Sequence, residues 1–171
     1  NGNRRTALVL LAAGAALAQD GPWILTTDYE VFGRIESFAP AAPWMVSGNL
    51  ALTPSDPVGR HHDGRVYVVG RGGSNAIRVH EADAALTFVR EFSVGAGRNP
   101  QDIVFDDQDR AWVPCYDEAV LLQVDVEAGT VVQAISTATY ADADGLPETA
   151  WAEIVDGKLY IACQNLDRDN W

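Results

Sequence analysis

Short apolar and aromatic segments recur along the chain at nearly regular intervals, separated by polar turns. When these segments are aligned with one another, four aromatic residues fall at the same position: Trp23, Tyr67, Trp112 and Tyr160. The spacings between these positions are 44, 45 and 48 residues. Because each segment is rich in β-branched or aromatic residues, it is typical of a buried β-strand. The pattern therefore predicts an internal repeat built from strands.

The residues that follow two of the aromatic positions also show strand patterns. Segment 119–126 alternates apolar and polar residues, which predicts a half-buried strand. In segment 75–82, Ile77 and Val79 share one face, so His80 is expected on the solvent face. The strands after each aromatic position are therefore expected to be amphipathic.

A further strand is predicted before two of the aromatic positions, in segments 101–106 and 151–155, which gives four strands per repeat. Four antiparallel strands that recur about every 45 residues predict the blades of a β-propeller. One blade cannot bury both faces of its sheet, so neighbouring blades must pack against it. The expected fold is all-β, a partial β-propeller with about three four-stranded blades of a ring of about six to eight. A β-sandwich is the competing fold, which the regular spacing disfavours.

The first residues have the pattern of a signal peptide, expected to span residues 1–18. Arg4 and Arg5 precede an apolar run of 13 residues, which ends in the small-residue sequence Ala16-Leu17-Ala18. A positive start, a short apolar run and an A-x-A cleavage site define a secretory signal. The alternative is a buried N-terminal helix. The signal pattern predicts that the mature chain, residues 19–171, is exported as a partial propeller. The apolar run is too short to span a bilayer, so no integral membrane span is expected in the mature chain.

The charge of the chain limits its partners. The formal net charge is -12, and the basic side chains are nearly all arginine. Nucleic acids and anionic lipids need a basic patch, which the sequence does not contain, so nucleic-acid binding is not expected. A cationic ligand or a divalent metal is a better electrostatic match, and a plain solvated acidic surface is the alternative.

Segment 141–148, "ADADGLPE", is the one candidate for calcium, and no other cofactor is expected. Asp142, Asp144 and Glu148 offer three carboxylates, but Gly145 comes two residues earlier than the glycine of an EF-hand loop. Calcium takes about six to eight oxygen ligands, so a neighbouring blade would have to complete the site. The alternative is a linker in which the aspartates cap turns.

Two cysteines and two adjacent histidines complete the candidate chemistry. Cys115 and Cys163 each lie three residues after an aromatic position, so a disulfide between successive blades and two separate buried thiols both remain open. His61 and His62 fall between glycines in a segment expected to be a solvated loop, and adjacent side chains on an extended chain point opposite ways. The histidines do not lie in a recognisable catalytic set.

Several longer segments carry a family resemblance. They are "LTTDYEVFGRIESF", "VYVVGRGGSNAIRVHEA", "GAGRNPQDIVFDDQDRAWV" and "YADADGLPETAWAEIVDGKLYIACQNLDRDNW". With these segments the chain resembles the bacterial YVTN-type repeat propellers, in particular an exported, lipoprotein-like subfamily. The chain departs from that pattern at Gln101, where a histidine is expected, and it has no cysteine of a lipid-anchor motif after the apolar run.

The resemblance implies where a site would lie. In similar propellers the strand after the N-P-x-D motif lines the central channel, and the linker before it lies at one mouth. Asn99, Gln101 and Asp102 would then ring the same opening as the carboxylates of segment 141–148, with Asn165 from the next repeat. With the signal pattern of residues 1–18, the resemblance to an exported bacterial subfamily predicts a periplasmic or extracellular location, including the bacterial cell surface.

Two functions follow from these features. The first is an exported interaction module that binds an unidentified protein or small-molecule ligand at the channel mouth without catalysis. The second is a propeller enzyme, such as a calcium-assisted lactonase or a quinone-type dehydrogenase, whose site would be completed by further blades. The lack of a recognisable catalytic set favours the binding module.

Overall fold

A computed structural model describes residues 23–27, 31–38, 42–43 and 45–168. The predicted signal peptide, residues 1–18, lies outside the described residues. Within those ranges the chain forms thirteen strands and one short 3-10 turn, η1 (Ala138–Tyr140). None of the helical structure in the described ranges is long and apolar enough to cross a membrane.

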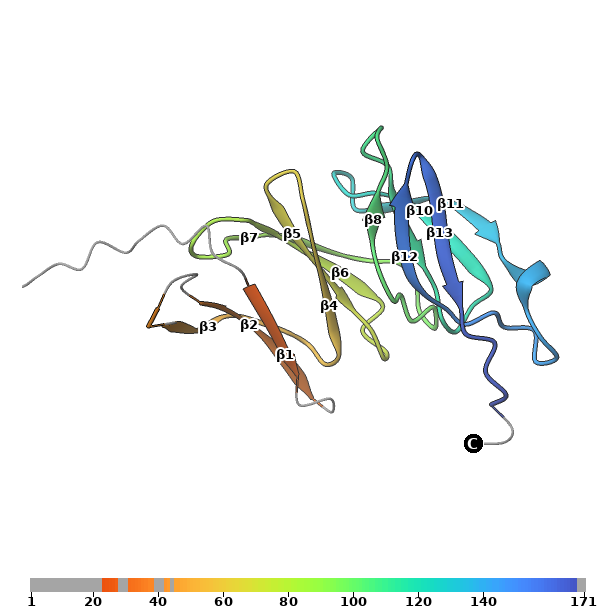
Figure 1. The fold of residues 1–171 in the computed structure, drawn as a ribbon, viewed down its shortest axis with the longest axis horizontal. Helices are drawn as coiled ribbons and strands as arrows, with labels where there is room; N and C mark the ends of the chain where they lie inside the picture. Colours follow the sequence, from red (N-terminus) through yellow and green to blue (C-terminus); the bar gives the residue numbers. More distant parts are fainter. Residues whose placement is uncertain (1–22, 28–30, 39–41, 44, 169–171) are drawn as a thin grey trace, which may run out of the picture.

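The strands form four antiparallel sheets that follow one another in chain order (Figure 1). We call these sheets blades 1 to 4. Blade 1 contains β1 (Trp23–Thr27), β2 (Phe32–Phe38) and β3 (Val46–Pro54). Blade 2 contains β4 (Pro57–His62), β5 (Arg65–Gly70), β6 (Ala76–Glu81) and β7 (Phe88–Ser93). Blade 3 contains β8 (Val104–Phe105), β9 (Ala111–Pro114), β10 (Val120–Asp125) and β11 (Thr130–Ser136). Blade 4 contains β12 (Thr149–Val155) and β13 (Lys158–Cys163).

The four aromatic positions occupy equivalent strands. Tyr67, Trp112 and Tyr160 lie in the second strands of blades 2, 3 and 4, each paired with the first strand of its blade. Trp23 lies in β1, which is followed by two antiparallel strands just as β5 is followed by β6 and β7. The repeat that the sequence predicts is therefore a repeat of structure.

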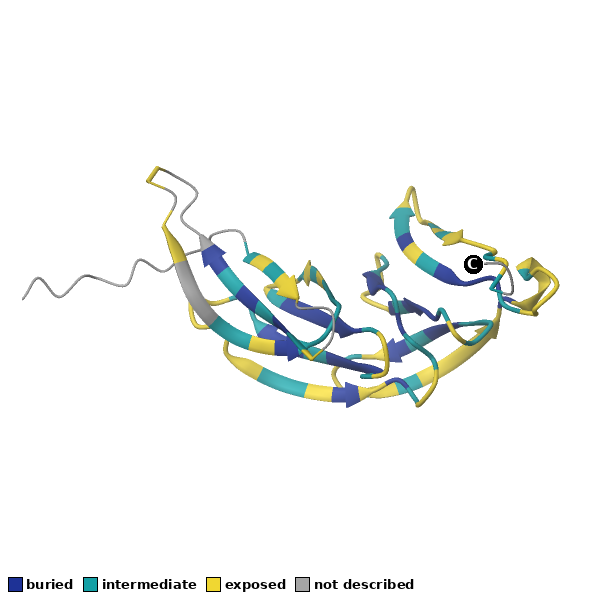
Figure 2. Ribbon diagram, turned by 90° about the horizontal axis from the view of Figure 1, so that it is seen from below, coloured by how far each residue is buried: buried dark blue, intermediate teal, exposed yellow. Residues whose placement is uncertain are grey.

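The core lies between the blades. In β5, Tyr67 and Val69 belong to a buried cluster shared with blade 3, whereas Val66 and Val68 belong to a second cluster shared with blade 1. Alternate residues of one strand thus pack against two different sheets. Figure 2 shows the buried residues concentrated on the strands that face a neighbouring blade.

This two-sided packing corrects the expectation for His80. His80 is buried, its Nδ1 lies 2.8 Å from the carbonyl oxygen of Leu86, and its ring meets Phe88 edge-on. Alternation predicts a solvated face only for a sheet covered on one side. Blade 2 is covered on both sides, so the polar residue of the pattern is buried as well.

Candidate functional site

The chain enters blades 2, 3 and 4 at equivalent residues. Asp56, Asn99 and Glu148 each have a left-handed backbone, with φ of 51°, 49° and 40°. The next residue in each case pairs with the third residue after the aromatic position, as in Pro57 with Gly70. We call these three residues the blade-entry positions. They bring the candidate residues before and after Asn99 and Glu148 to one end of the strands.

Asn99 and Gln101 lie together at this end. The side-chain oxygen of Asn99 accepts hydrogen bonds from the backbone N–H of Gly72 and from Nε2 of Gln101, both at 2.9 Å. Arg71 donates to the side-chain oxygen of Gln101 at 3.2 Å and also pairs with Asp56. The network connects the β5–β6 turn of blade 2 to blade 3. A role of Asn99 and Gln101 in ligand binding stays a prediction.

The structure corrects the expectation for Asp102, because this carboxylate is buried and fully engaged. Arg60 of blade 2 donates to its two oxygens at 2.8 and 2.7 Å. The backbone N–H of Ile103 donates at 2.9 Å, and that of Ala152 in blade 4 donates at 3.0 Å. With the residue 1% exposed, Asp102 connects three blades and does not present a surface to a ligand.

The calcium set is likewise not assembled. Glu148 is completely buried and accepts hydrogen bonds from Arg168 at 2.8 Å and from the backbone N–H of Leu166 at 3.2 Å. Asp142 and Asp144 are exposed, and each accepts a backbone N–H of its own turn. Among the described residues, no three histidine, cysteine or acidic side chains are placed to hold a metal ion. The segment behaves as the turn-capping linker.

Asn165 and the cysteines also have clear positions. Asn165 is exposed with φ of 47°, and its backbone N–H lies 3.5 Å from the carbonyl oxygen of Pro147, next to Glu148. Cys115 is a buried free thiol, and burial raises its pKa to about 12. Cys163 is an exposed free thiol. The disulfide expected as one alternative is not formed: Cys163 is exposed at the end of β13 in blade 4, whereas Cys115 packs into the core between blades 2 and 3.

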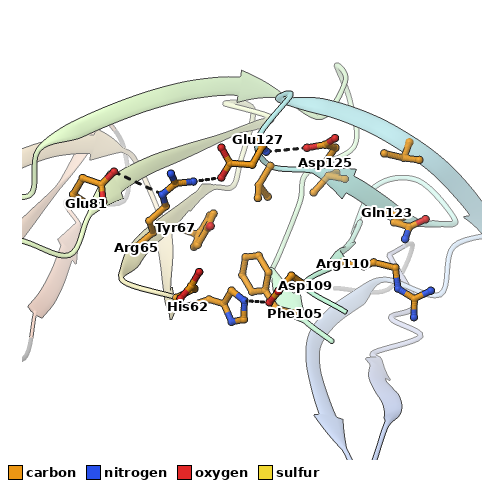
Figure 3. Close-up of a pocket in the computed structure, with 14 residues that line it drawn as sticks. His62, Arg65, Tyr67, Glu81, Phe105, Asp109, Arg110, Gln123, Asp125 and Glu127 are labelled. Carbon is orange, nitrogen blue, oxygen red and sulfur yellow. Dashed lines mark hydrogen bonds and ion pairs between the residues drawn. The ribbon is translucent and has the colours of Figure 1, made fainter. Parts of the chain in front are cut away.

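A pocket of about 610 Å³ lies at the opposite end of the strands, between blades 2 and 3 (Figure 3). Its residues come from the end of β4 and the turn after it, β5, the end of β6, β8 and the turn after it, β10 and the turn after it, and β11. Because both blades contribute, the pocket exists only where the two sheets pack together. A cavity of this size falls in the range of about 300–1,000 Å³ that small-molecule sites occupy.

Aromatic rings form one wall of the pocket. The His62 ring stacks parallel to Phe105 with 4.0 Å between centroids, and Tyr67 contacts the same Phe105 ring at 4.7 Å. Burial raises the pKa of the Tyr67 hydroxyl, so this group stays neutral. The wall is therefore apolar apart from the ring nitrogens of His62 and the hydroxyl of Tyr67.

Ion pairs across the two blades fix the rim. Arg65 of blade 2 pairs with Glu127 of blade 3 and lies 3.7 Å from Glu81, as Figure 3 shows. The hydrogen bond to Glu127 is the main cause that raises the pKa of Arg65. On the other side, Nε2 of His62 lies 2.9 Å from a carboxylate oxygen of Asp109. These contacts preform the opening of the pocket.

The turn that carries Asp109 is organised by Asp106. Its carboxylate accepts hydrogen bonds from the backbone N–H groups of Gln108 and Arg110, from the Arg110 guanidinium, and from the indole of Trp112. Burial alone raises the pKa of Asp106, but these hydrogen bonds outweigh it and lower the pKa to about 2. The ionised form of Asp106 therefore stabilises the β8–β9 turn.

The folded pKa of Asp106 lies below its unfolded value of about 3.9, so its stabilisation is complete above pH ~4 and is lost as the pH falls through ~2. We expect the wild-type chain to lose about 1 kcal/mol more than Asp106→Asn over this interval, after allowance for solvent screening at the turn. Urea unfolding at several pH values measures the difference. Asp107→Asn, in the same turn, removes a carboxylate that accepts none of these bonds and serves as the control. Equal pH slopes for wild type and Asp106→Asn would contradict the expectation.

Sequence reasoning did not find this pocket. It placed His62 in a solvated loop, whereas His61 and His62 end β4. The one useful signal was that adjacent histidines point opposite ways, which the structure confirms: His61 stacks on Trp23 of blade 1, and His62 stacks on Phe105 of blade 3. The rest of the lining comes from separate repeats and had no local pattern.

Comparison with known proteins supports the fold. No family model matches the chain, and no curated protein matches it. Among solved structures, the crystal structure of glutaminyl cyclase from Myxococcus xanthus, a β-propeller-like protein, is similar with a TM-score of 0.52 and 13% sequence identity. The similarity covers 82% of this chain but 62% of the cyclase, so the chain spans less than two thirds of that protein. Together with the four successive sheets, it shows that the described chain is a partial β-propeller.

Proposed function

We propose that the chain is part of an exported β-propeller that binds a ligand without catalysis, and that the pocket between blades 2 and 3 is the binding site. The observation that carries the proposal is that both blades build the pocket and that two contacts between them, the Arg65–Glu127 ion pair and the His62–Asp109 hydrogen bond, fix its rim. Preformed pockets with an apolar wall and a few placed polar groups are typical of binding sites. Export is supported by the signal pattern of residues 1–18, and the YVTN-type resemblance remains part of this proposal.

The chemistry of the lining favours binding over catalysis. The described residues that line the pocket include no serine, threonine, cysteine or lysine, so they offer no alcohol, thiol or amine nucleophile of those four types. Both of its arginines are held by carboxylates: Arg65 by Glu127, and Arg110 by Asp106 at 2.6 Å. The basic groups of the lining are thus held in place by neighbouring carboxylates.

An enzyme is the second candidate, favoured by the His62–Asp109 pair. A carboxylate that orients an imidazole is the arrangement of a general base. A calcium-assisted enzyme is disfavoured, because Glu148, one of the three carboxylates expected to bind calcium, is paired with Arg168. The similar solved structure is a glutaminyl cyclase, so incubation with a glutaminyl peptide and mass spectrometry is the direct assay. Turnover that His62→Ala abolishes would replace the binding proposal.

The binding proposal predicts that filling the pocket blocks binding. Val132 lines the pocket on β11 and is 62% exposed, so Val132→Trp adds bulk there without disturbing the core. In ligand-observed NMR with a panel of small organic cations, sugars and organic anions, we expect at least one compound to bind the wild type. We expect Val132→Trp to weaken that binding about tenfold or more, equivalent to about 1.4 kcal/mol.

Val155→Trp is the matched control, because Val155 is a strand valine in blade 4 that is also exposed, at 50%, and lies outside the pocket. It should leave binding unchanged. Binding that is insensitive to Val132→Trp, or a panel without any binder, would reject the pocket as the site.

A further inference from the structure

We propose that the pocket between blades 2 and 3 selects an organic cation, a small molecule or side chain that carries an ammonium or guanidinium group. This inference rests on the proposed binding function and names the ligand class of the same pocket. It follows from the charge balance, the aromatic wall and the size of the cavity.

Acidic side chains outnumber basic ones around the pocket. Its two guanidinium groups belong to Arg65 and Arg110, whereas its carboxylates come from five residues: Asp63, Glu81, Asp109, Asp125 and Glu127. A cleft lined by an excess of one sign concentrates ligands of the opposite sign. The formal charge of -12 on the whole chain acts in the same direction at longer range.

The two arginines are already committed. Arg65 is shared between Glu127 and Glu81, and Arg110 is held by Asp106, which does not line the pocket. The positive charge of each guanidinium is therefore already offset by a carboxylate.

Two carboxylates remain without a cation. Asp63 and Asp125 form no ion pair within the described part of the chain. Asp125 uses one carboxylate oxygen to accept the backbone N–H groups of Glu127 and Ala128, at 2.9 and 2.8 Å. A carboxylate fixed in this way holds its charge at the rim of the pocket without an internal partner.

The aromatic wall favours an organic cation over a metal ion. The stacked rings of His62 and Phe105, backed by the buried Tyr67, provide an apolar surface for the hydrocarbon part of a ligand. No three carboxylate, histidine or cysteine groups in the described ranges converge as metal ligands require. A volume of about 610 Å³ also suits a small organic molecule.

Three probes of matched shape test the inference by isothermal titration: benzylammonium, benzyl alcohol and benzoate. We expect benzylammonium to bind most tightly, benzyl alcohol several-fold more weakly, and benzoate not at all. Asp63→Asn with Asp125→Asn should weaken benzylammonium about tenfold, since two facing charges are removed. The same pair of changes should leave benzyl alcohol unaffected. Binding of the cation should also weaken as salt concentration rises.

Asp142→Asn is the control, because Asp142 is an exposed aspartate whose oxygen also accepts a turn N–H but lies outside the pocket. A loss of cation affinity in Asp142→Asn equal to that of the pocket variants would overturn the inference, since the effect would then be one of overall charge. Tighter binding of benzyl alcohol or benzoate, blocked by Val132→Trp, would overturn it too while leaving the binding function intact. The absence of binding by all three probes would reject the inference, and the broader NMR panel then decides the binding function separately.

Discussion

Replacing Asp102 with alanine is expected to lower the free energy of unfolding by about 3 kcal/mol, the largest single loss among the polar residues considered. The change leaves Arg60 without its carboxylate and removes the acceptor of the Ala152 backbone N–H in blade 4. Breaking a buried ion pair by removing one partner costs about 3–5 kcal/mol. The lower value applies because the Arg60 side chain is 32% exposed and can be partly hydrated. Urea unfolding monitored by tryptophan fluorescence measures the loss.

A surface ion pair provides the control for Asp102. Asp109 pairs with His62, but its side chain is 81% exposed, so Asp109→Ala should cost less than about 1 kcal/mol. Asp102→Asn should fall between the two, because the amide oxygen can still accept one backbone N–H while the charge that faces Arg60 is lost. Equal unfolding midpoints for Asp102→Ala and Asp109→Ala would show that Asp102 does not hold the blades together.

Glu148→Gln is expected to lower the free energy of unfolding by about 2 kcal/mol. The buried carboxylate of Glu148 accepts hydrogen bonds from Arg168 and from the backbone N–H of Leu166. The glutamine amide can satisfy the backbone donor, but it turns an N–H₂ group or a neutral oxygen toward the guanidinium. Glutamine is preferred to alanine here because it preserves side-chain size at a residue with φ of 40°.

Asp117 offers a matched control on the same arginine. Arg168 also pairs with Asp117 at 3.1 Å, but that carboxylate is 38% exposed. Asp117→Asn should therefore cost less than about 1 kcal/mol in the same unfolding assay. A larger cost for Asp117→Asn than for Glu148→Gln would mean that the ion pair to blade 3, and not the buried carboxylate of blade 4, anchors Arg168.

The strand repeat was predictable because it is written in local patterns. Each aromatic position, such as Tyr67, is surrounded by β-branched residues at a spacing that a strand alone explains. The structure places Tyr67, Trp112 and Tyr160 in the same strand of successive blades. Turn residues such as Gly72, with φ of 59°, were also readable from their type.

The expectations for single polar residues were wrong more often than those for the strands, because the partners of these residues are far away in sequence. Asp102 reads as a polar residue at a channel mouth, yet Arg60, 42 residues earlier, and Ala152, 50 residues later, enclose it. Glu148 reads as a metal ligand until Arg168 is seen beside it. A charged residue gives the same local signal whether it is solvated, paired or coordinating.

By itself the sequence determined the repeat, the β-class of the elements and the overall negative charge, since each depends on side-chain type and spacing along one strand. The tertiary structure decided which faces are buried, as His80 shows, and which charges are paired. It also created the pocket where His62 of one blade meets Phe105 of the next. The physical reason is that burial and ion pairing depend on the distance between residues in space, which only the packing of successive blades sets.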